Sequence, residues 1–488
     1  MSNYSYDVGT DVKTYQQYIA GSFFSTADHI EVLNPCNEEV IALAPRGTRE
    51  DADKAVAAAK AAQPKWGLLP APTRAEYLKK MAQVIRDNRV FLAETLATEQ
   101  AKVMGLAQVE IDVTAIYFDY YAGLSRSYEG EIIQSDRPNE QMMLHKLPIG
   151  VAVGICPWNF PFFVMARKIA PSLLTGNACV VKISEETPMV CLEFARLIEN
   201  IGLPNGILSI ITGYGHEVGQ ALSENPDVGI ISLTGSVGAG QKVMEAAAKN
   251  ITKVSLELGG KAPAIVCKDA DLDLAVKAIV ASRVIFSGQV CNCAERVYVE
   301  EEVYEEFMTK LLPAMKAVRV GDARTDDKAD MSAQINKTQL LKIDEMVKRA
   351  KEQGGEVLLG GRISSRFDKG YYYEPTVITN VEQDHDVMQN ETFGPVLPVM
   401  KVSSFDQAID FANDSEYGLT SSIYTNDINK ILRATKELLF GETYVNRENF
   451  EAIQGFHAGF RKSGIGGADG KHGLEEYLQT KVMYIQQN

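Results

Sequence analysis

Runs of apolar residues alternate with helix-like stretches through the middle of this chain. Between residues 149 and 258 the apolar runs, of five to eight residues, are GVAVGIC, ACVVKI, ILSIIT, GIISLTG and KVSLEL. Continuous apolar strands separated by helices are typical of a parallel sheet that is covered on both faces. The crossovers of such a sheet are right-handed, and its ligand binds beyond the carboxyl ends of the strands.

A second alternation of the same kind begins with PAIVC at residue 263 and runs to about residue 451. It includes helical patterns over residues 303–318 and 336–353, and it predicts a second α/β domain. Upstream, small apolar residues at helical spacing predict helices from residue 48 to about residue 128. We interpret those helices as a surface layer that carries no chemistry.

Two further segments read as strands without a partner nearby in the sequence. Residues 129–146 and 477–486 alternate polar and apolar positions. Because an isolated ribbon is only marginally stable, we expect these segments to pair with each other and with another subunit. The predicted fold is therefore α/β, with two doubly wound parallel-sheet domains and a small β ribbon for oligomerisation.

Composition and charge narrow the class of protein. The chain has 488 residues, of which 45% are apolar and 23% charged, as expected of a globular protein with two or three domains. Its formal charge of −15 argues against a nucleic-acid partner, which requires a basic surface. No apolar run approaches the roughly 20 residues of a membrane span, and the first residues lack the pattern of a secretory signal.

Cysteine and histidine usage indicates a reducing compartment and no metal. The seven cysteines are an odd number spread through apolar segments, which favours free thiols and a cytoplasmic location over a disulfide framework. None of the six histidines lies at metal-ligand spacing from a cysteine or a carboxylate. We therefore expect no metal site.

The run FSGQVCNCAER at residues 286–296 is the strongest candidate for chemistry. It places Cys291 on a turn between a helical and a strand-like pattern, and Gly288 lets the backbone bend closely there. A side chain on such a turn can face a cleft, which suits a nucleophile. The alternative is that Cys291 is a small buried hydrophobe, as most cysteines are. For Cys293 we expect a packing role, with a redox role as the alternative.

Two glycine-bearing turns follow predicted strands of the first sheet. Residues 212–219, TGYGHEVG, have one residue too many for a dinucleotide-binding GxGxxG motif, which favours a plain strand–helix turn. Residues 233–240, LTGSVGAG, leave a strand and start a helix at Ser236. The free N–H groups of such a helix start attract a phosphate, although an ordinary serine cap is an equal alternative.

Four polar residues stand where predicted strands end or just beyond them. Lys182 and Glu185 could hold the hydroxyls of a ribose, and a carboxylate there repels a 2′-phosphate; the alternative is a solvated strand end. Glu257 lies between two leucines, so burial is expected to raise its pKa toward that of a general base, unless it forms a salt bridge with Lys261. Asn159 lies in a loop fixed by prolines and could donate to an oxyanion with the Cys291 N–H, or could simply tie down the loop.

Together the motifs PWNFP, KxSE, TGS, ELGGK, GQxC and ETFGP resemble those of the NAD(P)-dependent aldehyde dehydrogenase superfamily, in the family's order and over nearly the whole chain. The resemblance implies Cys291 as nucleophile, Glu257 as general base and Asn159 as oxyanion donor, with Lys168 nearby. It implies a larger set of cofactor-binding residues: Trp158, Lys182, Glu185, Gly215, Gly235, Ser236, Gly259, Glu391 and Phe393. Ile183 stands where the family usually has proline, but Glu185 still favours NAD over NADP.

The runs YEGEIIQSDRP and SGQVCNCAERVYV resemble the bacterial lactaldehyde and glycolaldehyde dehydrogenases within that superfamily. This implies a polar pocket for a short hydroxyaldehyde, formed by Arg167, Asn292, Glu451 and His457. Other hydroxylated, sugar-derived or semialdehyde substrates are alternatives. So are a CoA-acylating enzyme, which a water-activating Glu257 argues against, a thiol–disulfide exchanger, and a non-catalytic binding protein on this fold.

The resemblance also assigns the domains. It implies a dinucleotide-binding domain from residues 1–128 and 149–258, and a catalytic domain that carries the thiol from residues 259–456. Residues 129–148 and 474–488 are then oligomerisation strands. We expect a homotetramer built from dimers.

Overall fold

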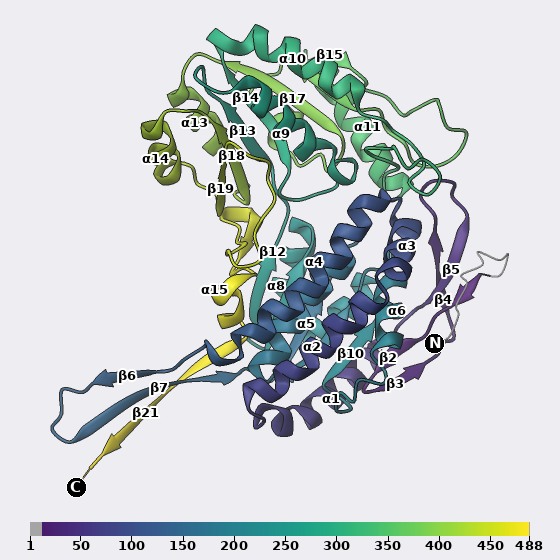
Figure 1. The fold of residues 1–488 in the computed structure, drawn as a ribbon. Coiled ribbons are helices and arrows are strands. Elements are labelled where there is room, and N and C mark those ends of the chain that lie inside the picture. Colours follow the sequence, from purple (N-terminus) through teal and green to yellow (C-terminus); the bar gives the residue numbers. More distant parts are fainter. Residues whose placement is uncertain (1–11, 488) are drawn as a thin grey trace.

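Two α/β lobes and a projecting ribbon make up residues 12–487, the part of the chain that the computed structural model describes (Figure 1). Residues 1–11 of the predicted first domain and residue 488 of the predicted tail strand lie outside the described residues. Each lobe is built on one mainly parallel sheet, as the alternating pattern predicts.

The first lobe contains an eight-stranded sheet in the order β20-β12-β11-β8-β9-β10-β2-β3. Its five central strands are parallel: β8 (Val151–Ile155), β9 (Ala178–Lys182), β10 (Leu208–Ile211), β11 (Ile230–Thr234) and β12 (Lys253–Glu257). Antiparallel strands complete the edges: β2 (Gln17–Ile19), β3 (Ser22–Phe24) and β20 (Gly464–Ile465). The central strands are apolar along their length because helices cover both faces.

Helices of the first lobe arise from two parts of the sequence. The predicted N-terminal helical region forms α1 (Arg49–Gly67), α2 (Ala71–Asp87), α3 (Arg89–Gln100) and α4 (Met104–Gly123). The crossovers contain α5 (Pro161–Thr175), α6 (Met189–Leu197), α7 (Gln220–Glu224) and α8 (Val237–Ala248). After the strand–helix turn predicted at residues 212–219, the helix is only the short α7, which follows a π-helical turn at Gly215–Gly219.

The second lobe contains a seven-stranded sheet in the order β15-β16-β17-β14-β13-β18-β19. The strands are β13 (Ala262–Val266), β14 (Ala294–Glu300), β15 (Glu356–Leu359), β16 (Thr376–Thr379), β17 (Val396–Val402), β18 (Thr420–Tyr424) and β19 (Glu442–Val445). The helices are α9 (Leu272–Val284), α10 (Tyr304–Ala317), α11 (Lys337–Glu352), α12 (Asp386–Gln389), α13 (Phe405–Asn413) and α14 (Ile428–Glu437). Only β15 runs antiparallel to its neighbour.

The two segments without local partners pair with each other. Strands β6 (Glu131–Gln134), β7 (Glu140–Pro148) and β21 (Leu478–Gln486) form a three-stranded antiparallel sheet in the order β21-β7-β6. This ribbon extends away from both lobes (Figure 1). A separate small sheet of β1 (Lys13–Thr14), β4 (His29–Leu33) and β5 (Val40–Pro45) lies near the N-terminus, and α15 (Gly470–Glu475) leads into β21.

The topology of the first sheet fixes where a ligand can bind. The chain passes from β8 through β9 to β10 and then returns to the other side of β8 as β11. The loops after β8 and β11 therefore diverge at the carboxyl edge and leave a crevice between them, the usual ligand position in an open α/β sheet. The loops that precede β14 and β17 of the second lobe approach the same edge.

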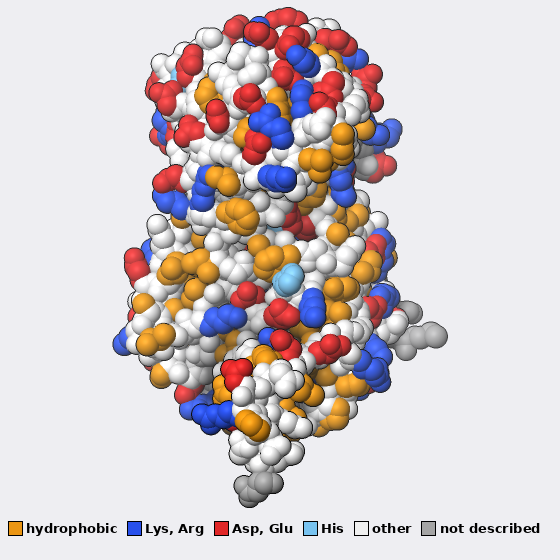
Figure 2. All heavy atoms as spheres, turned by 90° about the vertical axis from the view of Figure 1, so that its left-hand side faces the viewer, with side chains coloured by type: hydrophobic (Ala, Val, Ile, Leu, Met, Phe, Trp, Pro, Cys, Tyr) orange, Lys and Arg blue, Asp and Glu red, His pale blue; other side chains and the backbone are white. Residues whose placement is uncertain are grey.

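Charged side chains of both signs are interspersed over the face in Figure 2, with many Asp and Glu side chains on the second lobe at the top. Within residues 12–487, no helix is both long and apolar enough to cross a membrane.

Candidate active site

Two cavities meet where the lobes face each other, and both are lined by Cys291. The first is bordered mainly by α4, α5 and the segment after β19, and the second lies in the crevice beyond β8, β11 and β12. Asn159, Thr234 and Cys291 line both cavities. A molecule in one cavity and a molecule in the other would therefore approach each other at the thiol.

The Cys291 loop follows a strained turn. Phe286, Ser287 and Gly288 all have left-handed backbone conformations, with φ of 45°, 56° and 77°. Such a turn persists only where its surroundings hold it. Here Arg283 Nη2 donates to the Gly288 carbonyl at 2.5 Å, and Ser287 Oγ donates to the Ser332 carbonyl at 2.8 Å.

Of the two neighbouring thiols, only Cys291 faces a cavity. It is half-buried, whereas Cys293 is 1% exposed and packs with Phe286 and Val290. Arg283 Nη2 donates to Cys293 Sγ at 3.0 Å. The structure thus gives Cys293 a packing role, and the interpretation of Cys291 as a buried core residue is wrong.

His457 interacts with the candidate nucleophile. Burial raises the pKa of the Cys291 thiol, and a hydrogen bond with His457 partly opposes this. Burial disfavours the His457 imidazolium, but hydrogen bonds to Cys291 and to Glu442 outweigh it and raise the pKa of His457 well above its usual range. The Glu442 contact is 3.2 Å from Oε1 to Nδ1.

Asn159 lies beside the thiol loop in a buried position. Its Nδ2 donates to the Gln289 carbonyl at 3.0 Å, so the amide both ties the two loops together and keeps a second hydrogen for another acceptor. Its role as oxyanion donor stays a prediction, supported by its position on both cavities.

Glu257 is buried at the end of β12, but its partners are not those that the sequence indicates. Lys261 is paired elsewhere, with Glu295 at 2.8 Å. Instead Thr234 Oγ1 donates to Glu257 Oε2 at 2.8 Å. Arg167 Nη1 and Lys168 Nζ lie 3.7 and 4.0 Å from the carboxylate oxygens.

The predicted rise in the pKa of Glu257 is wrong in direction. Burial does raise it, but the charges of Lys168 and Arg167 outweigh that effect and lower the pKa below its ordinary value. Both cations come from α5, and flanking leucines in a sequence cannot reveal them. Glu257 is therefore an ionised carboxylate at neutral pH.

One part of the first cavity, next to the thiol loop, is polar. Arg167 Nη2 donates to Glu451 Oε1 at 2.9 Å, and Asn292 Nδ2 donates to the other oxygen of Glu451. Arg167 also makes two hydrogen bonds with Asp469, a residue that the sequence did not single out. Three of the four predicted substrate residues, Arg167, Asn292 and Glu451, line this cavity, and His457 reaches the thiol.

The second cavity brings together most of the predicted cofactor residues. Its lining includes Trp158, Gly235, Ser236, Gly259, Glu391 and Phe393. The rings of Trp158 and Phe393 meet edge to face at 5.4 Å between centroids. Glu391 accepts from the Gly260 N–H at 2.8 Å, and burial together with the charge of Glu295 raises its pKa to about 7.

The remaining predicted cofactor residues lie outside this cavity's lining. Lys182 Nζ and Glu185 Oε2 pair with each other at 2.6 Å at the end of β9. Gly215 is exposed at the start of the π-helical turn. Ser236 Oγ accepts from the Ala239 N–H at 3.2 Å, so it caps α8 as the simpler interpretation holds, and it also borders the cavity.

Known proteins match this arrangement over almost its whole length. The sequence profile of the Aldehyde dehydrogenase family matches residues 23–483. The lactaldehyde dehydrogenase of Escherichia coli (strain K12) is 54% identical over 474 residues, which cover 97% of this chain and 98% of that protein. The chain belongs to the aldehyde dehydrogenase family.

Solved structures of aldehyde dehydrogenases share the fold described above. The crystal structure of lactaldehyde dehydrogenase from Escherichia coli superposes with a TM-score of 0.96 at 54% identity, covering 98% of this chain and 100% of that one. A structure of 3,6-anhydro-L-galactose dehydrogenase in complex with NAP gives 0.95 at 45% identity, covering 97% and 100%. The predicted fold class is confirmed, and the protein is an enzyme that oxidises aldehydes.

Aldehyde dehydrogenases use NAD(P), and the second cavity fits such a cofactor. It lies at the switch point of the first sheet and at the N-terminus of α8, where free N–H groups attract a phosphate. A Cβ at Gly259 would lie 2.8 Å from both oxygens of Glu391, so glycine there lets that carboxylate lie close to the backbone. The residues that would hold the nicotinamide end are Trp158, Glu391 and Phe393.

The interpretation of the N-terminal helices as a surface layer without chemistry is wrong for this aldehyde dehydrogenase. Lys102, in the loop between α3 and α4, and Glu110 of α4 form a buried ion pair. Lys102 Nζ donates to the Asn159 carbonyl at 2.8 Å. Glu110 Oε1 accepts from the N–H groups of Phe162 and Phe163, at the start of α5. The pair thus fixes both the Asn159 loop and the helix that carries Arg167 and Lys168.

Replacing Lys102 by methionine is expected to destabilise the enzyme by about 3–5 kcal/mol, because it leaves the Glu110 charge buried without a partner. Urea unfolding measures the free-energy change. Lys79→Met is the matched control, since Lys79 forms an exposed pair with Glu76 and should leave the unfolding midpoint unchanged. Equal midpoints for the two variants would contradict the structural role of Lys102.

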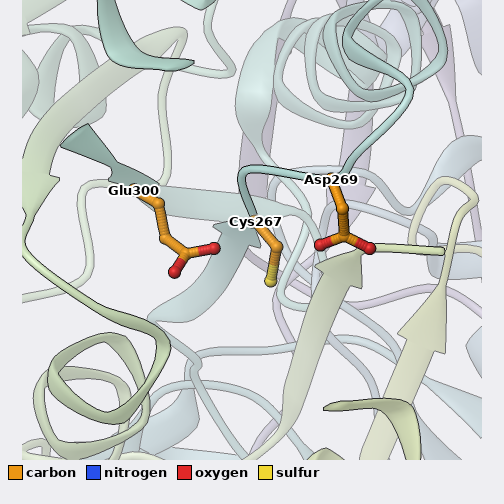
Figure 3. Close-up of side chains that lie close together, drawn as sticks. All are labelled: Cys267, Asp269 and Glu300. Carbon is orange, nitrogen blue, oxygen red and sulfur yellow. The ribbon is translucent and has the colours of Figure 1, made fainter. Parts of the chain in front are cut away.

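One cluster among the described residues has the composition of a metal site. Cys267, Asp269 and Glu300 place ligand atoms within 4.8 Å of one another at the carboxyl edge of the second sheet (Figure 3). Lys430 Nζ lies 3.2 Å from Asp269 and 2.9 Å from Glu300 and offsets one of their two negative charges. Burial raises the pKa of Cys267 to about 12, so the thiol stays protonated. These contacts describe an ion-pair cluster, and the absence of a metal stays a prediction.

Proposed function

We propose that this aldehyde dehydrogenase oxidises short hydroxyaldehydes, of the lactaldehyde or glycolaldehyde type, to carboxylic acids with NAD as the cofactor. The observation that carries the proposal is the polar end of the first cavity, where Arg167, Asn292 and Glu451 converge near Cys291. An apolar aldehyde would place apolar surface against these polar groups without offering them a hydrogen bond, whereas a hydroxyl group next to the carbonyl can donate to a Glu451 oxygen. The name of the Escherichia coli relative supports the same substrate class.

The proposed reaction begins with attack by Cys291. The thiolate forms a C–S bond with the aldehyde carbon, while the Asn159 amide and the Cys291 N–H stabilise the oxyanion. The bound nicotinamide dinucleotide supplies the hydride acceptor. Loss of the aldehyde hydrogen as hydride to that acceptor would break the C–H bond and leave a thioester on Cys291. Glu257 then takes a proton from water, the resulting hydroxide forms a C–O bond with the thioester carbon, and the C–S bond breaks to release the acid and the Cys291 thiolate.

Glu257 is suited to the role of base by its environment. The lowered pKa keeps it ionised, and it lines the second cavity together with Cys291. Thr234 links it to Lys168, because Lys168 Nζ donates to Thr234 Oγ1 at 2.9 Å and Thr234 donates to Glu257. Lys168 is thus a positioning residue in this proposal.

The preference for NAD rests on Glu185. A carboxylate at the end of β9 repels a 2′-phosphate, and the ion pair with Lys182 holds it at that strand end. NADP is the less favoured alternative. Gly215 is assigned to the adenosine side of the same cofactor.

The free cysteines support a cellular location, and the exposed ribbon supports an assembly. All seven cysteines, each within the described residues, are free, which supports the cytoplasm. The ribbon exposes apolar side chains, including Ile132 at 80% and Tyr484 at 62%. Burial of that surface in a homotetramer of dimers is the assembly that we propose.

An NADH-release assay over paired aldehydes tests the substrate class. Glycolaldehyde and acetaldehyde form one pair, and lactaldehyde and propanal the other; the members differ by one hydroxyl group. We expect kcat/KM to be at least about 100-fold higher for the hydroxylated member of each pair. The buried polar groups of the cavity discriminate against an aldehyde that lacks the hydroxyl group. In the same assay, the rate of reduced-cofactor formation should be lower with NADP than with NAD. The Glu185→Ala variant should show a smaller ratio of the NAD rate to the NADP rate. Equal kcat/KM within each pair would overturn the proposal.

A further inference from the structure

The guanidinium of Arg167 has the shape and charge of a carboxylate receptor, and it lines the cavity in front of Cys291. A free arginine in that position would bind aldehydes that carry a second, ionised carboxyl group. Its Nε and Nη2 donors are instead taken by the protein's own carboxylates, and Nη1 faces Glu257 Oε2 at 3.7 Å. Asp469 Oδ1 accepts from Nε at 3.0 Å, and Asp469 Oδ2 and Glu451 Oε1 accept from Nη2 at 2.5 and 2.9 Å.

The charges at this end of the cavity do not cancel. Arg167 contributes +1, and Asp469 and Glu451 contribute −1 each, so the three groups sum to −1. The neighbouring cations are occupied: Lys168 lies 4.0 Å from Glu257, and His457 contacts Glu442 at 3.2 Å. Because each of these two cations is paired with a carboxylate of its own, neither offsets the net charge of −1 on Arg167, Asp469 and Glu451.

Asp469 is held in this position at a conformational cost. Its backbone has φ of 70° and ψ of 162°, a region that residues with a side chain rarely adopt. The residue is 1% exposed, and its side chain is directed at Arg167. Glycine would adopt this backbone without strain but could not contact Arg167. The strained backbone at Asp469 is therefore offset by what its carboxylate contributes.

We propose that Asp469 is a specificity-determining residue that acts through Arg167, together with Glu451, to exclude carboxylate-bearing aldehydes from the cavity. An incoming carboxylate finds Nε and Nη2 of the arginine occupied, a third carboxylate facing Nη1, and a net negative charge. An uncharged hydroxyl group can instead donate to a carboxylate oxygen. The inference rests on the proposed function for the position of the substrate in the first cavity.

The test compares succinic semialdehyde, which carries a terminal carboxylate, with butanal, an uncharged aldehyde of the same chain length. The variants are Asp469→Asn, Glu451→Gln and the double variant. We expect the ratio of kcat/KM for succinic semialdehyde to that for butanal to rise about 10- to 100-fold in the double variant, the range of one hydrogen bond between charged groups. The gain should come mainly from a lower KM for succinic semialdehyde, which a purely structural effect of the substitutions would not produce.

Asp410→Asn is the matched control, because it removes the charge of an exposed aspartate on α13. A ratio that stays at the wild-type value in folded, active variants would overturn the inference, as would an equal rise in the control. If Asp469→Asn does not fold, Glu451→Gln alone decides: a rise supports the inference and no rise overturns it. A wild-type enzyme that prefers butanal to its hydroxylated analogue would refute the proposed function without affecting this ratio.

Discussion

Replacing Cys291 by alanine is expected to lower kcat for glycolaldehyde by about 10⁴- to 10⁶-fold, the range for the loss of a catalytic nucleophile. The thiol is the half-buried cysteine that lines both cavities, and no bond to the aldehyde carbon can form without it. Cofactor binding should persist, because alanine leaves Trp158, Glu391 and Phe393 in place. NADH formation measures the first effect, and titration calorimetry with NAD measures the second.

Cys293→Ala is the control for that experiment, since it removes a buried thiol two positions away. Cys293 is 1% exposed and contacts Arg283 and the Val290 carbonyl, so its loss should affect stability and leave the chemistry intact. A Cys291→Ala enzyme that kept more than about a hundredth of wild-type turnover would contradict the covalent route.

Replacing Glu257 by glutamine is expected to slow steady-state turnover by about 10²- to 10⁴-fold, as for the loss of a general base. Glutamine keeps the shape and the hydrogen bond from Thr234 but removes a charge that Lys168 and Arg167 stabilise. Since the thioester would still form, one equivalent of NADH should appear rapidly before turnover slows. Rapid mixing with glycolaldehyde measures that burst and the slow phase separately.

The matching control is Glu245→Gln, an exposed substitution on α8 that should leave both phases unchanged. If Glu257→Gln retained the wild-type steady-state rate, another group would have to activate the water. If the burst disappeared together with the slow phase, Glu257 would act before the thioester forms, as a base toward Cys291.

Much of the architecture could be read from the sequence because it depends on local patterns. Apolar runs separated by helical stretches specify a parallel sheet, and the carboxyl ends of such strands converge on one edge. The strand pattern placed Asn159, Ser236 and Glu257 at the ends of different strands, and the family resemblance implied that they share a site. The loop with Cys291 was recognisable because the chain must turn there between a helix and a strand.

The electrostatic partners of these residues were decided by the tertiary structure alone. Arg167 and Asp469 lie 302 positions apart. Gln100 and Lys102 approach Asn159 from the end of α3 and the loop after it, a segment that carries no visible motif. A buried charge must be compensated by an opposite charge close to it in space, wherever that charge lies in the chain. Sequence periodicity reports which face of a strand or helix is buried, but it does not report which distant group the fold places against it. The sequence therefore determined where the reacting groups stand along the chain, whereas folding determined the ionisation of Glu257 and the occupied state of Arg167.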